Sequence, residues 1–287
     1  MIKVYVPNIS KTSIGGGFRF CENFKKALIG RVEFVNKWED AHIIFIFGIT
    51  TINKGEIHDA VNAGKKLVLR VDNVPRKSRN HRQSPANRLG EFGNKASMVV
   101  YQSEWCKKYA GYFIKNANEI IINNGVDTSI FNEEGRKSDG YTYLYMNYND
   151  NPNKRFDEAL YRFDMDWRED NEKHLIIAGN IPKVYLGHSE YNFDIPSEAR
   201  VDYIGVLETP EKVVEVMKIC DYLLYPSFAE AYPNTLLEAI ACGLKPLYVN
   251  SEGGAREVIK NNYKEVKTIQ EMADEYYAIF IGLINIK

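Results

Sequence analysis

Hydrophobic positions along the chain form short runs, separated by stretches in which apolar residues recur every three or four positions. Runs of branched and aromatic residues predict β-strands at 2–6, 41–47, 65–71, 97–103, 119–123, 141–146, 174–179, 201–205, 221–227 and 244–249. Between them, the helical spacing of Phe20, Phe24, Ala27 and Leu28 exemplifies the amphipathic pattern. Apolar strands alternating with helices are typical of parallel sheets covered on both faces, so we expect an α/β fold.

The strand and helix pattern restarts after a polar, charged and glycine-containing segment at 132–140. We therefore expect two Rossmann-like domains, 1–131 and 132–287, facing each other across a cleft. The last segment, 268–287, carries a helical apolar face made of Ile269, Met272, Ala273, Tyr276 and Phe280. That face predicts a closing helix at the C-terminus.

Composition and charge describe an ordinary globular chain. Of 287 residues, 45% are hydrophobic and 26% charged, and the net charge of -1 gives no general attraction to nucleic acid or anionic membranes. No apolar run approaches the roughly 20 residues of a membrane helix, and the N-terminus reads as a strand and not a signal peptide. Cysteines stand far apart without C-x-x-C spacing, which predicts reduced thiols in a cytoplasmic protein and neither zinc site nor disulfide framework: Cys21, Cys106, Cys220 and Cys242.

The stretch "EAYPNTLLEAIACG", 230–243, places Glu230 before a proline and Glu238 inside a helical run. Proline is tolerated at a helix start, and the free amides of the first turn there form an anion site. Carboxylates beside such a site suit hydroxyl groups, so the pattern favours a ligand with phosphates between two polyols, a nucleotide sugar. The alternative is that Glu230 ends a loop and Glu238 is a solvated helix residue.

The longer stretch "PSFAEAYPNTLLEAIACGLKPLYVNSEGGAREVI" resembles the donor-domain signature of retaining glycosyltransferases of family 4, the glycosyl transferases group 1. The shared pattern is Glu-x7-Glu, then Ala-x-x-x-Gly followed closely by a proline (here Pro246), then Gly-Gly-x-x-Glu. "NNGVDTSIF" (123–131) and "IGGGFRF" (14–20) are similar to further family segments. The resemblance implies the GT-B fold and metal-independent, retaining transfer of a hexose from a UDP-, GDP- or ADP-linked donor. The acceptor would be a glycan, a lipid-linked glycan or a small molecule.

The resemblance also implies roles for individual residues. Glu238 would bind the donor ribose and Glu230 a hydroxyl of the transferred sugar, while Lys154, helped by Arg155, would neutralise the diphosphate. The backbone of the turn would hold the sugar and the distal phosphate: Ala231, Tyr232, Pro233, Asn234 and Thr235. Gly15 and Gly16 would let the backbone approach the diphosphate, and Val206 and Leu207 would line the base pocket. The alternative for Lys154 and Arg155 is that they are solvated caps of the following helix. The alternative for Val206 and Leu207 is that they pack in the core.

The acceptor side is expected in the basic, proline-containing stretch 70–88. Arg70 and Asp72 stand at a strand end that should face the cleft, with Asp72 a candidate catalytic carboxylate, and His81 lies farther along. Such a loop could bind an anionic acceptor. The alternatives are a structural Arg70–Asp72 pair and a merely solvated loop.

Several features depart from the family pattern. Met146-Asn147-Tyr148 stands where the family usually has an arginine, and Ala231-Tyr232-Pro233 replaces Gly-Phe-Gly. Asp164 and Asp166 form an Asp-x-Asp motif like that of metal-dependent transferases of another fold. The alternatives to a transferase are therefore a nucleotide-sugar epimerase or hydrolase, and a catalytically silent sugar-nucleotide or glycan-binding protein.

Overall fold

The computed structural model describes residues 1–7, 16–49, 52–72, 74, 85–148, 152–181, 198–262 and 265–285. The chain divides into two compact units, Met1–Gly125 with Lys267–Lys287, and Val126–Val266. The polar stretch 132–140, where we expected the boundary between the two domains, therefore lies within the second unit. There the amide of Lys137 donates to the carbonyl of Lys218 at 2.9 Å, and Arg136 pairs with Asp221 at 3.3 Å.

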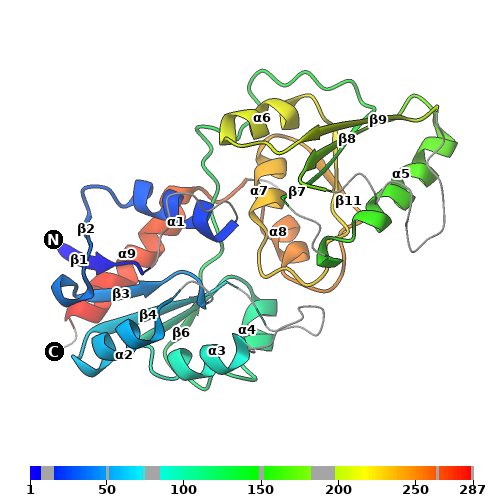
Figure 1. Cartoon of the computed structure of the whole chain (residues 1–287). Coiled ribbons are helices and arrows are strands. Elements are labelled where there is room, and N and C mark those ends of the chain that lie inside the picture. Colours follow the sequence, from blue (N-terminus) through cyan, green and yellow to red (C-terminus); the bar gives the residue numbers. More distant parts are fainter. Residues whose placement is uncertain are drawn as a thin grey trace. The chain divides into compact units, whose positions relative to one another are not determined.

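The first unit is built on a parallel sheet with strand order β2-β1-β3-β4-β5-β6 (Figure 1). Its strands are β1 (Ile2–Tyr5), β2 (Val32–Val35), β3 (Ile43–Ile46), β4 (Lys66–Val71), β5 (Met98–Tyr101) and β6 (Glu119–Ile121). The helices within its first segment, Met1–Gly125, are α1 (Gly16–Ala27), η1 (Trp38–Asp40), α2 (Lys54–Asn62), α3 (Pro85–Gly93) and α4 (Glu104–Ala110). Among the described strands, β2 is the one that the hydrophobic pattern missed, because it has only four residues and Glu33 interrupts its apolar positions.

The second unit contains a parallel sheet with the order β11-β10-β7-β8-β9. Its strands are β7 (Thr142–Asn147), β8 (His174–Gly179), β9 (Arg200–Gly205), β10 (Tyr222–Leu224) and β11 (Lys245–Leu247). Its helices are η3 (Pro152–Lys154), α5 (Phe156–Glu169), α6 (Pro210–Lys218), α7 (Asn234–Ala241) and α8 (Ala255–Asn262). Residues of α6, α7 and α8 pack in one core cluster and residues of α5 in another, so helices cover both faces of the sheet (Figure 1).

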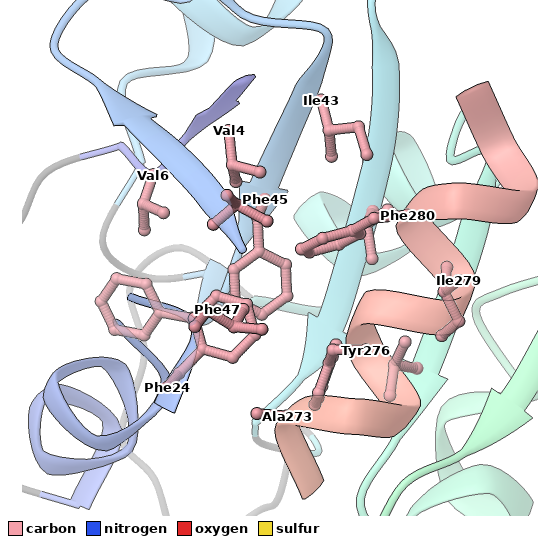
Figure 2. Packing of buried hydrophobic residues seen from close by; sticks show 14 of the residues in the cluster. Val4, Val6, Phe24, Ile43, Phe45, Phe47, Ala273, Tyr276, Ile279 and Phe280 are labelled. Atoms are coloured by element: carbon pink, nitrogen blue, oxygen red, sulfur yellow. The ribbon is translucent and has the colours of Figure 1, made fainter. Parts of the chain in front are cut away.

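The last helix, α9 (Ile269–Asn285), belongs to the first unit and packs beside α1. Figure 2 shows Tyr276 and Phe280 from α9 lying against Phe24 and Phe45. The ring centroids of Tyr276 and Phe45 are 5.4 Å apart. The predicted apolar face is confirmed for Met272, Ala273, Tyr276 and Phe280, which are buried. The helix begins with a capping box, in which Thr268 Oγ1 accepts from the amide of Glu271 and the Glu271 carboxylate accepts from the amide of Thr268.

Gly125 lies where the chain leaves the first unit, directly against the start of α9. A Cβ at this position would lie 2.1 Å from the carbonyl oxygen of Thr268, so only glycine fits here. The amide of Gly125 also donates to the sulfur of Met272 at 3.3 Å.

Two general properties of the chain follow from the described ranges. No helix within them is both long and apolar enough to cross a bilayer. The four cysteines are free and buried, as expected from their spacing.

Candidate functional site

The candidate site lies at the point of the second sheet where the chain changes direction. From the central strand β7 the chain runs outward through β8 and β9, then returns to place β10 and β11 on the other side of β7. In an open parallel sheet, loops diverge at the carboxyl ends of the two strands that flank such a switch point, and ligands bind there. A ligand is therefore expected at the loops that follow β7 and β10.

These two loops bring together Lys154 and Glu230. The amide of Phe228 donates to the carbonyl of Asn153 at 2.7 Å, which ties one loop to the other. Lys154 Nζ lies 3.3 Å from Glu230 Oε1, and the two side chains are only 25% and 18% exposed. The implied diphosphate cation and the implied sugar carboxylate thus share one partly buried position, where water screens their charges less than at the surface.

A third segment, 252–254, holds the backbone of Glu230. The amide of Ala229 donates to the carbonyl of Glu252 at 2.8 Å, and the carbonyl of Glu230 accepts from the amide of Gly254 at 2.7 Å. Gly253 has φ of +119°, and a Cβ there would lie 2.8 Å from the backbone nitrogen of Glu230. The first glycine of the Gly-Gly pair is therefore explained by close backbone approach to the loop that carries Glu230.

Arg155 differs from its neighbour Lys154. It takes the cap position before α5 with a left-handed φ of 51°, and its guanidinium lies 2.6 Å from Glu158 in the first turn of the same helix. The structure thus gives Arg155 a contact within its own helix, and it brings Lys154, not Arg155, to Glu230.

Helix α7 begins directly after Pro233, with the implied phosphate contacts Asn234 and Thr235 in its first turn. The amides of a first turn have no carbonyl partner within the helix, and they carry the positive end of the helix dipole. Tyr232 is buried, and its hydroxyl accepts a hydrogen bond from the side-chain amide Nδ2 of Asn262 at 3.1 Å. This bond holds the turn before the helix in place.

Glu238 is only 4% exposed. This burial excludes the alternative of a solvated helix glutamate. A carboxylate is costly to bury unless hydrogen bonds satisfy it, so a buried acidic residue one turn into α7 requires polar partners.

The remaining implied donor residues are less concentrated. Val206 is 38% exposed after β9, whereas Leu207 is half-buried and packs against the core formed with α6 and α7. Gly16 is the first residue of α1 in the first unit, with no atom within 4 Å of a Cβ built on it. Gly15 and His81 lie outside the described residues.

On the expected acceptor side, Arg70 is a buried residue of the first unit's interior, 2% exposed. Its guanidinium donates to the carbonyl of Phe47 at 2.9 Å, to Gln102 at 2.7 Å and to Asn124 at 3.0 Å, and it stacks on the ring of Phe20. Burial lowers the pKa of Arg70, which the negative charge of nearby Asp72 partly offsets. These contacts favour the structural alternative for Arg70.

Asp72 follows β4 and is half-buried. Its Oδ1 accepts from the amide of Ile49 at 3.4 Å, and its Oδ2 would lie 2.9 Å from a Cβ at Gly48. The carboxylate is therefore held against the loop after β3.

The Asp-x-Asp motif lies inside α5, and its two carboxylates make different structural contacts. Asp164 is buried and pairs with Arg168 at 2.9 Å, while Asp166 accepts from the hydroxyl of Tyr248 at 2.6 Å. Among the residues that the structure describes, no three His, Cys, Asp or Glu side chains gather in a way that could hold a metal ion.

Sequence reasoning missed three contributors to this region: Asn153, Tyr145 and Tyr248. Tyr145 donates to the carbonyl of Lys154 at 3.2 Å and so fixes the loop after β7. A tyrosine inside an apolar strand gives no sequence signal for such a bond. Tyr248 has a left-handed φ of 57°, which no pattern predicts for an aromatic residue.

Three comparisons place this geometry among known proteins. No curated protein sequence matches the chain. HepE from Anabaena, solved in complex with UDP and glucose, aligns at a TM-score of 0.67 and 14% identity over 100% of this chain and 90% of its own. Sucrose-phosphate synthase from Thermosynechococcus elongatus aligns at a TM-score of 0.69 and 12% identity over 99% of this chain and 91% of its own.

Trehalose-6-phosphate synthase OtsA also aligns, at a TM-score of 0.65 and 9% identity, over 100% of this chain and 92% of its own. These likenesses, with the two Rossmann-like sheets and the C-terminal helix, show the GT-B fold that was expected. The sequence profile described as glycosyl transferases group 1 matches residues 126–279. Since that match covers more than half of the chain, the protein belongs to the glycosyl transferases group 1 family.

Proposed function

We propose that this glycosyltransferase moves a hexose from a nucleotide sugar to a glycan, lipid-linked or small-molecule acceptor, with retention of the anomeric configuration and without a metal. The observation that carries the proposal is the Lys154–Glu230 pair at the switch point of the second sheet, 3.3 Å apart. One member suits a diphosphate and the other a sugar hydroxyl.

The chemistry required is separation of a sugar from a nucleoside diphosphate. Negative charge grows on the leaving phosphate as the bond breaks, and groups fixed in advance stabilise it most effectively. Lys154 supplies a cation, and the first-turn amides of α7 supply dipoles. When a donor binds, its diphosphate would replace Glu230 as the partner of Lys154, which releases the Glu230 carboxylate to accept a hydrogen bond from the sugar.

Glu238 completes the proposed donor site. Its position in α7, one turn after Asn234 and Thr235, matches a ligand whose ribose lies beyond its phosphates. Retention is proposed from the family resemblance, in which the leaving phosphate helps to deprotonate the acceptor on the same face of the sugar. That route requires no protein nucleophile.

UDP-glucose is the donor to test first, because HepE was solved in complex with UDP-glucose and aligns at a TM-score of 0.67. We also propose a cytoplasmic location, which the buried free cysteines support.

The experiment is calorimetric titration of the protein with UDP, GDP and ADP, followed by incubation of the matching nucleotide sugar with a panel of acceptors, with and without EDTA. We expect one nucleotide to bind, and its sugar to be turned over equally in both conditions. Release of free sugar or of an epimer without acceptor would instead indicate a hydrolase or epimerase. Nucleotide binding without any turnover across an acceptor panel would indicate a binding protein, and loss of activity in EDTA that manganese restores would contradict metal independence.

A further inference from the structure

Three residues other than glycine have a left-handed backbone within the described part of the chain: Arg155, Ala229 and Tyr248. All three belong to the second unit, and each follows the carboxyl end of a neighbouring strand, β7, β10 or β11 respectively. Strained backbone persists only where surrounding contacts enforce it, and such residues cluster at functional sites. For Tyr248, which has a φ of 57°, the side chain and the segment that follows it both make contacts within the second unit.

The side chain of Tyr248 is anchored to α5. Its hydroxyl donates to Asp166 Oδ1 at 2.6 Å, and the guanidinium of Arg162 lies 5.1 Å from the centre of its ring. The hydrogen bond from Tyr248 to the Asp166 carboxylate is charge-assisted, and such bonds are stronger than neutral ones.

The backbone of Tyr248 begins the segment that holds Glu230. This segment, 248–254, runs from the end of β11 to the glycine pair, where Glu252 and Gly254 make the two backbone bonds to Ala229 and Glu230. The segment is thus fixed at its start by the Tyr248 side chain and at its end by the loop that carries the proposed sugar carboxylate.

A second chain of contacts runs from the same tyrosine to the other side of the site. Arg162, which lies over the Tyr248 ring, is 3.6 Å from Glu158 Oε1, and Glu158 Oε2 is 2.6 Å from Arg155. Arg155 adjoins Lys154 in the chain. Tyr248 therefore connects to both loops of the switch point.

We propose that Tyr248 and Asp166 form a latch that positions the 248–254 segment, and through it Glu230, for sugar transfer. This inference rests on the proposed function of Glu230. The latch gives the Asp-x-Asp motif a role without a metal, because its second carboxylate acts by orienting Tyr248 and touches no substrate. Tyr248 is thus a positioning residue.

The test compares Tyr248→Phe, which keeps the ring on Arg162 and removes only the hydroxyl, with Tyr222→Phe. Tyr222 is a partly buried tyrosine of the same core cluster. We expect Tyr248→Phe to lower kcat for the nucleotide sugar by about tenfold, because the lost hydrogen bond to Asp166 leaves Glu230 less well placed. The Kd of the free nucleotide should change less than about twofold, because Glu230 is proposed to contact only the sugar. Tyr222→Phe should leave both values unchanged.

Asp166→Ala should lower kcat similarly, and the double variant Tyr248→Phe, Asp166→Ala should be no worse than Asp166→Ala alone, because both remove the same interaction. Additive losses, or an equal fall in nucleotide affinity, would overturn the latch and indicate general destabilisation.

Hydrogen exchange tests the latch independently of any activity. In Tyr248→Phe, the amides of Ala229 and Gly254 should exchange at least about fivefold faster than in the parent protein, because segment 248–254 loses its anchor. Unchanged exchange would refute the latch even if no donor were turned over. Faster exchange in a chain that binds no nucleotide would instead support the latch and refute the proposed function.

Discussion

Lys154 Nζ and Glu230 Oε1 lie 3.3 Å apart, although the two residues come from loops on different strands and stand far apart in the sequence. Lys154→Met should remove the cation while keeping the length of the side chain. We expect kcat/KM for the nucleotide sugar to fall by about 10²- to 10³-fold, as when one group that stabilises a growing negative charge is lost. Steady-state kinetics measures this, with the exposed Lys260→Met as control; equal kinetics for both variants would contradict the role of Lys154.

The two glutamates should separate by what they bind. Glu238→Gln should weaken free nucleoside diphosphate by roughly 10- to 150-fold, the cost of about 1.5–3 kcal/mol for hydrogen bonds to a charged group. Glu230→Gln should leave nucleoside diphosphate binding nearly unchanged and lower turnover, because sugar contacts matter most as positive charge builds on the ring. Calorimetry and rate measurements distinguish these outcomes, and negligible effects of both substitutions would refute both roles.

Gly253 should tolerate no side chain. Gly253→Ala places a Cβ 2.8 Å from the backbone nitrogen of Glu230 at a φ of +119°, whereas Gly135→Ala places one in open space at a φ of +73°. Gly135→Ala should cost about 1–2 kcal/mol of unfolding free energy, the strain of a left-handed residue alone. Gly253→Ala should cost clearly more in urea denaturation; equal costs would mean that the backbone contact with Glu230 is dispensable.

The buried thiols predict loss of stability in alkali. Burial raises the pKa of Cys21 to about 11 and those of Cys220 and Cys242 to about 12, from 9.0. Between pH 9 and these values the unfolded chain loses thiol protons that the native chain keeps, so the free energy of unfolding falls as pH rises, by roughly 1 kcal/mol per thiol at pH 10.

Urea denaturation at pH 8 and pH 10 checks this expectation. In Cys220→Ala the free energy of unfolding should fall less between pH 8 and pH 10 than in the parent protein, because one of the buried thiols is missing. An identical fall in the variant would show that other groups account for the alkaline effect.

The alternating pattern of the sequence was enough to predict the parallel strands and the buried face of α9. Apolar runs that are too continuous for a half-exposed strand require cover on both faces, and the four confirmed positions of α9 recur at helical spacing. Strand β2 was missed because it has only four residues, and the charged Glu33 stands among its apolar positions.

The composition of the site was less predictable. That β10 lies beside β7, and so brings Glu230 to Lys154, depends on strand order, which local patterns do not encode. Arg70 shows another limit of local patterns: the sequence left a structural role and an acceptor role open, and the burial of its guanidinium depends on distant acceptors at Phe47, Gln102 and Asn124. The left-handed backbone of Tyr248 accompanies a contact with Asp166, which lies 82 positions away in the sequence and so leaves no local signal.

The position of α9 has a consequence for the order in which the protein is made. Phe24 and Phe45, near the beginning of the chain, are covered by Tyr276 and Phe280, near its end (Figure 2). During synthesis the ribosome releases every residue of the second unit before α9 emerges, so that unit can complete its core first. The first unit, although translated earlier, must expose aromatic surface until the final residues arrive, and a nascent chain stalled before 269 would be a natural client for chaperones that recognise such surface.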